Sequence, residues 1–168
     1  MIAMNMAAFI TAGSIGLGAT LVIDLWALLL KRGFGIASLD ICLLGRWALH
    51  IPRGRIRHER IAAAERMPHE CPVGWTMHYL IGATFAVMFV VLASPAWLAH
   101  PTLVPALVFG AATVLVPFLT IQPAFGLGIA SSNAPNPRQA RLKSVSTHTV
   151  FGIGLWLFAT LLAMSRSA

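Results

Sequence analysis

The chain has 168 residues, of which 58% are apolar and 10% charged, and its formal net charge is +7. This composition excludes an ordinary soluble domain, because such domains carry about 25% charged residues. The length accommodates four membrane-crossing helices of about 20 residues. The basic residues stand in loops, where they suit anionic lipid headgroups, so we expect one transmembrane domain over residues 1–168 and no nucleic-acid binding.

The first predicted membrane-spanning helix covers about residues 6–30. No Lys or Arg precedes its apolar run, which is too long for the apolar region of a cleaved signal peptide. We therefore expect it to stay in the protein as a helix. In the long connection that follows, residues 31–72, the apolar part from Ile36 to Ile51 is too short to cross a bilayer. This part is predicted to form an amphipathic or re-entrant helix, followed by a basic segment on the membrane surface.

Three more segments are apolar and long enough to span a membrane, at about residues 73–92, 102–127 and 144–164. The third of the four spans contains three prolines and is predicted to be kinked, because proline removes a helical hydrogen bond. The predicted fold class is therefore all-α, an integral membrane bundle of four transmembrane helices.

The distribution of Lys and Arg predicts the orientation in the membrane. The loops 31–72 and 131–143 are basic, whereas the loop 94–101 carries no formal charge. By the positive-inside rule, both basic loops lie in the cytoplasm and both termini lie outside, in a bacterial inner membrane. Cys42 and Cys71 both fall in the first cytoplasmic loop, and because the cytoplasm keeps thiols reduced we expect both to be free.

Four polar side chains inside the predicted spans reach one depth. Counted at about 1.5 Å per residue from the cytoplasmic end of each helix, Asp24 lies roughly 10 Å inside, His78 roughly 9 Å and His148 roughly 8 Å. Gln122 falls at a similar level on the third span. The positions four residues away on each helix are small or polar, which is typical of helix contacts. The four side chains are therefore predicted to point into the bundle and to meet.

A carboxylate and two imidazoles in a dry interior match the ligand set of a divalent transition metal such as zinc or iron. The predicted metal ligands are Asp24, His78 and His148. The candidate substrate-binding residues are Gln122, Thr20 and Trp26. Three other interpretations stay open: hydrogen bonds that only hold the bundle together, a proton-linked or substrate-binding site, and, with less support, a haem b held by the two histidines.

A short internal repeat accompanies these residues. Each of the two histidines precedes a glycine by four positions, in the segments His78–Gly82 and His148–Gly152. If the chain consists of two similar helical hairpins in parallel, Asp24 on the first span corresponds to Gln122 on the third.

Four stretches of the sequence resemble a known family. They are Gly18–Trp26, Pro72–Gly82, Pro123–Pro137 and Thr147–Gly152. Together they are similar to a bacterial family of four-helix membrane proteins catalogued only as a domain of unknown function. The resemblance spans nearly the whole chain and implies the four-helix architecture. It also places the three predicted metal ligands inside family-like segments, but it implies no activity.

These observations support one leading hypothesis and two alternatives. We expect a small integral membrane protein whose cytoplasm-facing intramembrane site binds a divalent metal for catalysis or transport. The alternatives are a proton-coupled small-solute transporter and a non-catalytic accessory subunit in which the polar residues are structural. The expected partners are the lipid bilayer and either further copies of this chain or another membrane subunit.

Overall fold

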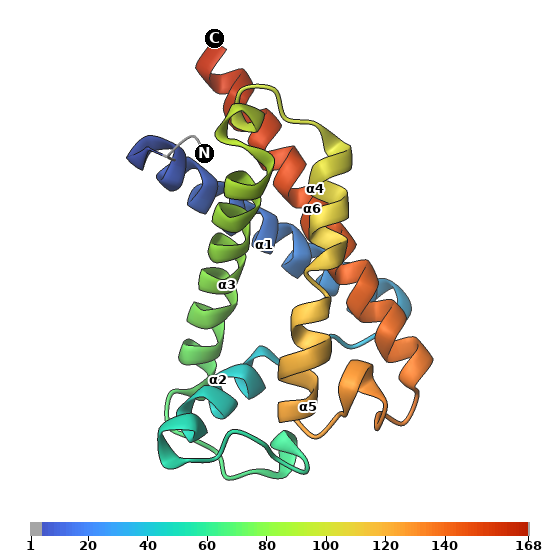
Figure 1. Ribbon diagram of the computed structural model, residues 1–168. Coiled ribbons are helices and arrows are strands. Elements are labelled where there is room, and N and C mark those ends of the chain that lie inside the picture. Colours follow the sequence, from blue (N-terminus) through green and yellow to red (C-terminus); the bar gives the residue numbers. More distant parts are fainter. Residues whose placement is uncertain (1–4, 168) are drawn as a thin grey trace.

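A computed structural model describes residues 5–167 of the chain, so the first four residues and the last one of the predicted domain lie outside it (Figure 1). Four of its helical segments are long and apolar enough to cross a membrane. They are α1 (Met6–Phe34), α3 (Glu70–Ala93), a broken helix over Leu103–Ala124, and α6 (Pro137–Ser167). The described residues contain no strand. The predicted all-α fold with four spans is confirmed, and the protein is a membrane protein.

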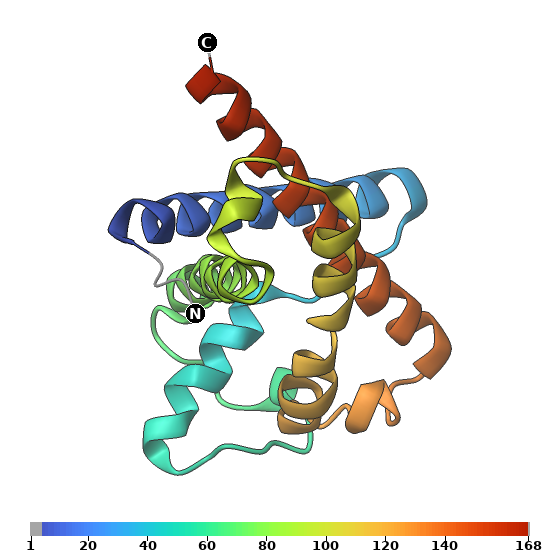
Figure 2. The ribbon, with the colours of Figure 1, turned by 45° about the horizontal axis from the view of Figure 1, so that its top comes forward.

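The four spans are not packed equally against one another. α1 contacts both α3 and α6, and α6 contacts α4 (Leu103–Ala112), while α3 and α4 touch each other little. α1 crosses α3 obliquely, since Figure 2 shows α3 nearly end-on and α1 along its length. The start of α1 and the end of α6 lie at one end of the bundle, the terminal end, and α2 (Ile41–His50) lies at the other, the loop end (Figure 1).

Glycines permit the closest approaches between the spans. At the crossing of α1 and α3, a Cβ atom added to Gly16 would stand 2.5 Å from the backbone oxygen of Gly82. Where α4 meets α6, a Cβ atom on Gly152 would stand 2.5 Å from the backbone oxygen of Ala106. Neither position has space for a side chain, so the stripes of small residues seen in the sequence are contact surfaces between helices.

The third span is broken as predicted. α4 ends at Ala112, a single π-helical turn, η4, follows at Pro117–Ile121, and α5 covers only Gln122–Ala124. Pro117 has no N–H to offer the carbonyl of Thr113, which instead accepts a bond from the N–H of Val116 at 3.1 Å. The span ends before the predicted limit near residue 127, because Gly126 has a φ of 87° that no regular helix adopts.

α6 begins at Pro137, well before the predicted start near residue 144. Proline suits the first turn of a helix, and the side chain of Asn136 accepts a hydrogen bond from the backbone N–H of Gln139 at 3.3 Å. The basic residues assigned to the loop 131–143 therefore include several on the first turns of α6, Lys143 among them.

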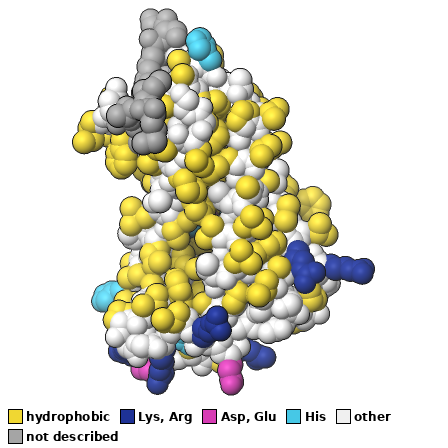
Figure 3. All heavy atoms as spheres, in the orientation of Figure 1, with side chains coloured by type: hydrophobic (Ala, Val, Ile, Leu, Met, Phe, Trp, Pro, Cys, Tyr) yellow, Lys and Arg dark blue, Asp and Glu magenta, His cyan; other side chains and the backbone are white. Residues whose placement is uncertain are grey.

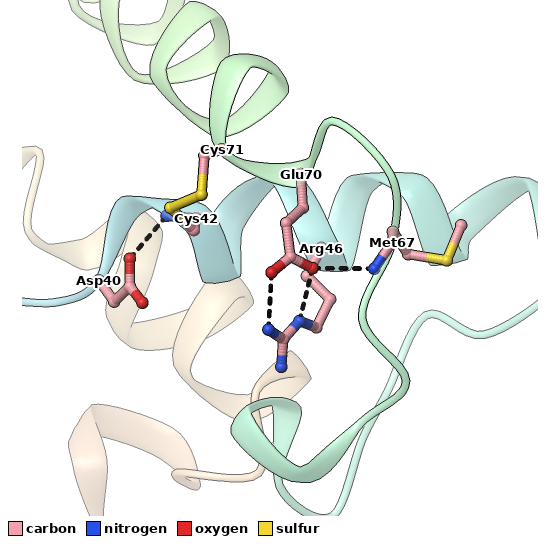
Figure 4. The surroundings of a disulfide bond; sticks show 6 residues. All are labelled: Asp40, Cys42, Arg46, Met67, Glu70 and Cys71. Carbon is pink, nitrogen blue, oxygen red and sulfur yellow. Dashed lines mark hydrogen bonds and ion pairs between the residues drawn. A yellow bond between two sulfur atoms is a disulfide. The ribbon is translucent and has the colours of Figure 1, made fainter.

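The short helix expected in the first long loop is α2, which packs on the base of α3. A Cβ atom on Gly45 would overlap the backbone of Glu70 and lie 2.5 Å from the nitrogen of Gly74. This close contact brings together the first turns of the two helices, where Cys42 and Cys71 form a disulfide (Figure 4). The prediction of two free thiols was wrong. It rested on the expected compartment alone, whereas the pairing follows from how α2 docks on α3.

A buried ion pair reinforces the same contact (Figure 4). Arg46 of α2 binds Glu70 of α3 through two hydrogen bonds of 2.7 and 2.8 Å, with 6% and 13% of the two side chains exposed. The third guanidinium nitrogen donates to the carbonyl of Ala62 at 3.1 Å. Hydrogen bonding to Glu70 raises the pKa of Arg46 above its ordinary value, so the pair stays charged.

The loop 51–69 lies across the loop end and reaches the third span. The backbone N–H groups of His58 and Ile61 donate to the carbonyls of Ala124 and Phe125, at 2.9 and 3.2 Å. A small apolar cluster forms beneath these bonds from Leu44, Ile61, Ala124 and Phe125. A larger cluster fills the terminal half of the bundle between all four spans. On the face in Figure 3, apolar side chains cover the middle of the molecule and charged ones gather at the loop end.

Candidate functional site

A cavity of about 690 Å³ lies in the loop half of the bundle. Its walls come from α1, α3, η4, α5, α6 and the linker between α1 and α2. Lys31 and the linker residues Ser38, Leu39 and Asp40 line it and are exposed, so the cavity opens on this side, whereas Gln122 and Phe125 are buried. The volume is within the range of sites for small organic molecules.

All four polar residues that the sequence analysis placed at one depth line this cavity. Asp24 comes from α1, His78 from α3, Gln122 from α5 and His148 from α6. They do not form one contact cluster, however. Each of the two histidines binds a partner within its own helix pair, as described next.

Asp24 and His78 are in direct contact across the α1–α3 crossing. The Nε2 atom of His78 lies 3.0 Å from Oδ1 of Asp24, and the hydroxyl of Tyr79 donates to Oδ2 at 2.8 Å. The indole of Trp75, another cavity-lining residue, stands edge-on to His78 with ring centroids 5.8 Å apart. Asp24 therefore accepts two hydrogen bonds and still borders the cavity.

Tyr79 was not among the predicted site residues. It follows His78 directly and so belongs to a different stripe of α3, but its long side chain reaches back to the carboxylate. A signal was available, since Tyr79 is the single tyrosine of the chain and lies within a predicted span. A phenol in lipid needs a hydrogen-bond partner.

His148 binds Thr113, at the end of α4, rather than Asp24. The Thr113 hydroxyl donates its one hydrogen to the carbonyl of Gly110 at 2.6 Å, so its oxygen accepts from Nδ1 of His148 at 2.7 Å. In the neutral imidazole this arrangement fixes the proton on Nδ1 and leaves Nε2 as an acceptor. Thr113 was not predicted as a site residue, because its role depends on where α4 ends.

The remaining predicted residues have structural partners. The amide of Gln122 accepts from the hydroxyl of Ser131 at 2.9 Å and donates to that of Ser144 at 3.2 Å, which fixes its orientation in the cavity wall. Thr20 is 1% exposed, donates to the carbonyl of Gly16 at 2.8 Å and packs against Gly82. Trp26 has a buried indole N–H without a partner in the described part of the chain. Neither Thr20 nor Trp26 lines the cavity.

The three predicted metal ligands are not assembled around one point. Among the described residues, no group of three or more His, Cys, Asp or Glu side chains is arranged to hold a metal ion. Asp24 and His78 touch each other, while His148 is engaged by Thr113. Metal binding therefore stays a prediction.

Two lysines mark the opening of the cavity. Lys31 is at the end of α1, and Lys143 on α6 donates to the carbonyl of Ala37 in the α1–α2 linker at 2.7 Å. This bond ties the linker to α6. At the other end of the linker, Asp40 caps α2 by accepting from the backbone N–H of Cys42 at 2.9 Å.

The model of a family described as a protein of unknown function, DUF2938, matches residues 14–162. The chain belongs to this family. The matched range contains every residue that lines the cavity, together with both cysteines. No curated protein and no solved structure is significantly similar to the chain. Membership of DUF2938 thus agrees with the resemblance found in the sequence and brings no assigned activity.

Proposed function

We propose that the cavity binds a small organic solute and that the Asp24–His78 pair exchanges a proton as the solute binds, as in a proton-coupled transporter. One observation carries this proposal: a carboxylate and an imidazole, 3.0 Å apart, border a cavity of about 690 Å³ within the membrane-spanning helices. Ionisable groups at this depth are costly and usually serve function.

Competition for one carboxylate links the solute to the proton. A donor group of the solute that binds Asp24 takes the place of the hydrogen bond from His78 or from Tyr79. A proton on Asp24 removes the charge that attracts this donor. Because each ligand lowers the affinity for the other, proton uptake releases the solute and solute binding releases the proton.

Transport also requires access from the terminal end, which the larger apolar cluster closes. The broken third span is the element best suited to change shape. Its π-helical turn contains Pro117 and Ile121, both of which line the cavity, and α4 has little contact with α3. Discontinuous helices beside a midplane site are common in secondary transporters.

The proposal includes a location in a bacterial inner membrane with both termini outside. Apart from Arg166, the Lys and Arg residues of the sequence belong to the end of α1, to residues 46–66 of the first long loop and to the first turns of α6, which supports a cytoplasmic loop end. The Cys42–Cys71 disulfide at the same end is more typical of an oxidising compartment. Fusing alkaline phosphatase or a fluorescent protein to the C-terminus tests the orientation. An active phosphatase and a dark fluorophore support it, and the reverse pattern contradicts it.

Proteoliposomes under an imposed pH gradient test the transport proposal. We expect solute-dependent proton flux from a panel of small solutes, and loss of that flux in Asp24→Asn. The control is Thr84→Val, which removes a hydroxyl of α3 that bonds only to its own helix and does not line the cavity. Flux that survives in Asp24→Asn contradicts the role of Asp24, and absence of flux across the panel contradicts transport and favours an accessory subunit.

A divalent metal such as zinc or iron is the second candidate ligand. It is favoured by the placement of Asp24, His78 and His148 around one cavity, where His148 has an acceptor nitrogen to offer. Elemental analysis tests it: stoichiometric metal in the purified protein and its loss in the Asp24→Ala, His78→Ala double variant support metal binding. Absence of metal from both preparations contradicts it. A Soret band in the absorption spectrum would indicate haem b instead.

A further inference from the structure

The polar groups of the cavity differ in character between its inner part and its opening. Inside, the walls offer acceptors, namely the carboxylate of Asp24 and the Nε2 atom that Thr113 leaves unprotonated on His148. At the opening they offer the cations of Lys31 and Lys143 and one carboxylate, that of Asp40, which already accepts a hydrogen bond from the backbone N–H of Cys42, so positive charge is in excess there. A ligand that satisfies both regions has a hydrogen-bond donor at its inner end and an anionic group at its outer end.

Both lysines have capacity for a ligand. Lys31 is exposed, and within residues 5–167 its ammonium makes no hydrogen bond or ion pair. Lys143 uses one N–H on the carbonyl of Ala37, which leaves two further donors. The two side chains come from α1 and α6 and both line the cavity, so both can contact an anionic group held at the opening.

The helix geometry gives the length of the ligand. Along α1, Asp24 and Lys31 are two turns apart, which is about 10 Å. Along α6, His148 and Lys143 are separated by about 8 Å. Both paths run from the inner acceptors to the outer cations, and they agree on the spacing between the two polar ends.

The wall between the two polar regions is apolar. Between Asp24 and Lys31 along α1 it is lined by Ala27 and Leu28, and Ile121 and Phe125 are further apolar lining residues. This stretch favours a hydrocarbon spacer, since burying apolar surface is favourable and an unpaired polar group here would lose its hydration. Trp75, next to His78, adds an aromatic face of the kind that attracts an ammonium group.

We infer that the cavity takes a linear zwitterionic amphiphile, with a primary ammonium at Asp24 and a carboxylate or phosphate at Lys31 and Lys143. An apolar chain of about 10 Å joins the two ends. This inference rests on the proposed function, because it names the class of solute for the same cavity. The ammonium is the donor that competes with the proton at Asp24.

The charges also set the order of affinity among related molecules. An amine of the same length keeps the contact with Asp24 and leaves the lysines hydrated at the opening, at little cost. An acid of the same length keeps the lysine contacts and leaves the inner carboxylate without a cation. The zwitterion should therefore bind best, the amine next and the acid least.

Three probes of equal chain length test this order: 8-aminooctanoate, octylamine and octanoate. Calorimetric titration of the purified protein should show 8-aminooctanoate binding about tenfold tighter than octylamine, the effect of one additional charged hydrogen bond, and octanoate binding more weakly than octylamine. Asp24→Asn should remove its advantage over octanoate. The Lys31→Gln, Lys143→Gln double variant should remove its advantage over octylamine. The heat of titrating each probe into the triple variant Asp24→Asn, Lys31→Gln, Lys143→Gln is subtracted. This subtraction corrects for partition of the probes into detergent.

Arg57→Gln serves as the matched charge control, because Arg57 is an exposed cation of the loop end that does not line the cavity. It should leave all three affinities unchanged. Equal affinities for the three probes, tighter binding of octanoate, or an effect of Arg57→Gln as large as that of the lysine changes would overturn the inference. A thermal midpoint for each variant confirms that it is folded.

The two proposals fail separately. Proton-coupled flux of another solute class, with no preference for 8-aminooctanoate, would overturn the ligand class and leave the transport proposal standing. The expected binding order without any coupled flux would support the ligand class and contradict proton-coupled transport.

Discussion

The two helix pairs α1–α3 and α4–α6 use the same packing device for different chemistry. In each pair a glycine of the second helix packs closely on the first helix, and a histidine stands one turn before that glycine. His78 meets the carboxylate of Asp24, whereas His148 meets the hydroxyl of Thr113. A repeated scaffold thus holds a carboxylate–imidazole pair on one side of the cavity, called the charged side, and a hydroxyl–imidazole pair on the other, called the neutral side.

The charged side is also the side with the additional supports. α2, the disulfide and the Arg46–Glu70 ion pair all attach to the base of α3. The other side is held by hydrogen bonds of Thr113 and Gln122 and by the backbone bonds from the loop 51–69 to Ala124 and Phe125. The α1–α3 pair, which contains the ionisable group Asp24, therefore has a covalent bond and an ion pair that brace it. The α4–α6 pair has neither, and it contains the helix break.

The largest effect is expected from Glu70→Ala, which tests the bracing of the charged side. The change leaves the buried guanidinium of Arg46 without its carboxylate and should lower the free energy of unfolding by about 3–5 kcal/mol. Glu65→Ala is the control, since this side chain is 67% exposed and lies 3.8 Å from Arg53, and the loss should not exceed about 1 kcal/mol. Unfolding in mixed micelles measures both. Equal losses would show that the ion pair does not brace α3.

Gly82→Val and Gly152→Val test whether the two pairs share one packing device. A Cβ atom on Gly82 would overlap the hydroxyl of Thr20, and one on Gly152 would stand 2.5 Å from the backbone oxygen of Ala106, so each variant should lose about 1–3 kcal/mol of unfolding free energy. In Gly13→Ala the new Cβ atom meets nothing within 4 Å, and stability should stay equal or rise by up to about 1 kcal/mol. If only one of the two valine variants is destabilised, the two helix pairs do not share the same glycine packing.

Thr113→Val tests the neutral side. Loss of the hydrogen bond to His148 should lower the free energy of unfolding by about 0.5–1.5 kcal/mol. The neutral imidazole of His148 should then be able to adopt either tautomer. Nitrogen NMR of His148 detects this change, because the proton is no longer fixed on Nδ1. Thr160→Val, which removes a hydroxyl of α6 bonded to the carbonyl of Trp156, should leave the His148 signal unchanged. A fixed Nδ1 proton in Thr113→Val would refute the assignment.

The smallest effect concerns the loop 51–69 and pH. Burial, and then the neighbouring His50, lower the pKa of His58 below its ordinary value of about 6.5. Above that pH the imidazole is neutral in both states. As the pH falls below it, the unfolded chain takes up a proton that the folded loop resists, so stability falls. Thermal midpoints between pH 7.5 and pH 5 should decrease less in His58→Asn than in the natural protein, and equal slopes would contradict this.

Hydropathy and helical periodicity were enough to predict the four spans, α2, the break in the third span and the four polar residues around one cavity. These features follow from properties local to each helix. The depth of Asp24, for example, follows from its distance to Lys31 along α1, and the proline content of the third span predicts its break.

Features that depend on how the helices are rotated and docked could not be predicted. The disulfide requires α2 to lie on the first turn of α3, and the partner of His148 depends on where α4 ends. Asp24 bonds to His78, whereas Gln122 bonds to Ser131 and Ser144, so the contacts of these two residues do not follow from the sequence repeat. Sequence distance alone contains no information on these rotations.

The backbone bonds from the loop 51–69 to the third span impose an order on biosynthesis. His58 and Ile61 bind Ala124 and Phe125, which leave the ribosome only after α3 and α4 have been made. The loop 51–69 therefore cannot form these bonds until the third span has been synthesised. Because Phe125 also lines the cavity, the wall of the cavity is incomplete until the third span is in place. A chain arrested before Phe125 would contain the Asp24–His78 pair but not the complete cavity that this pair borders.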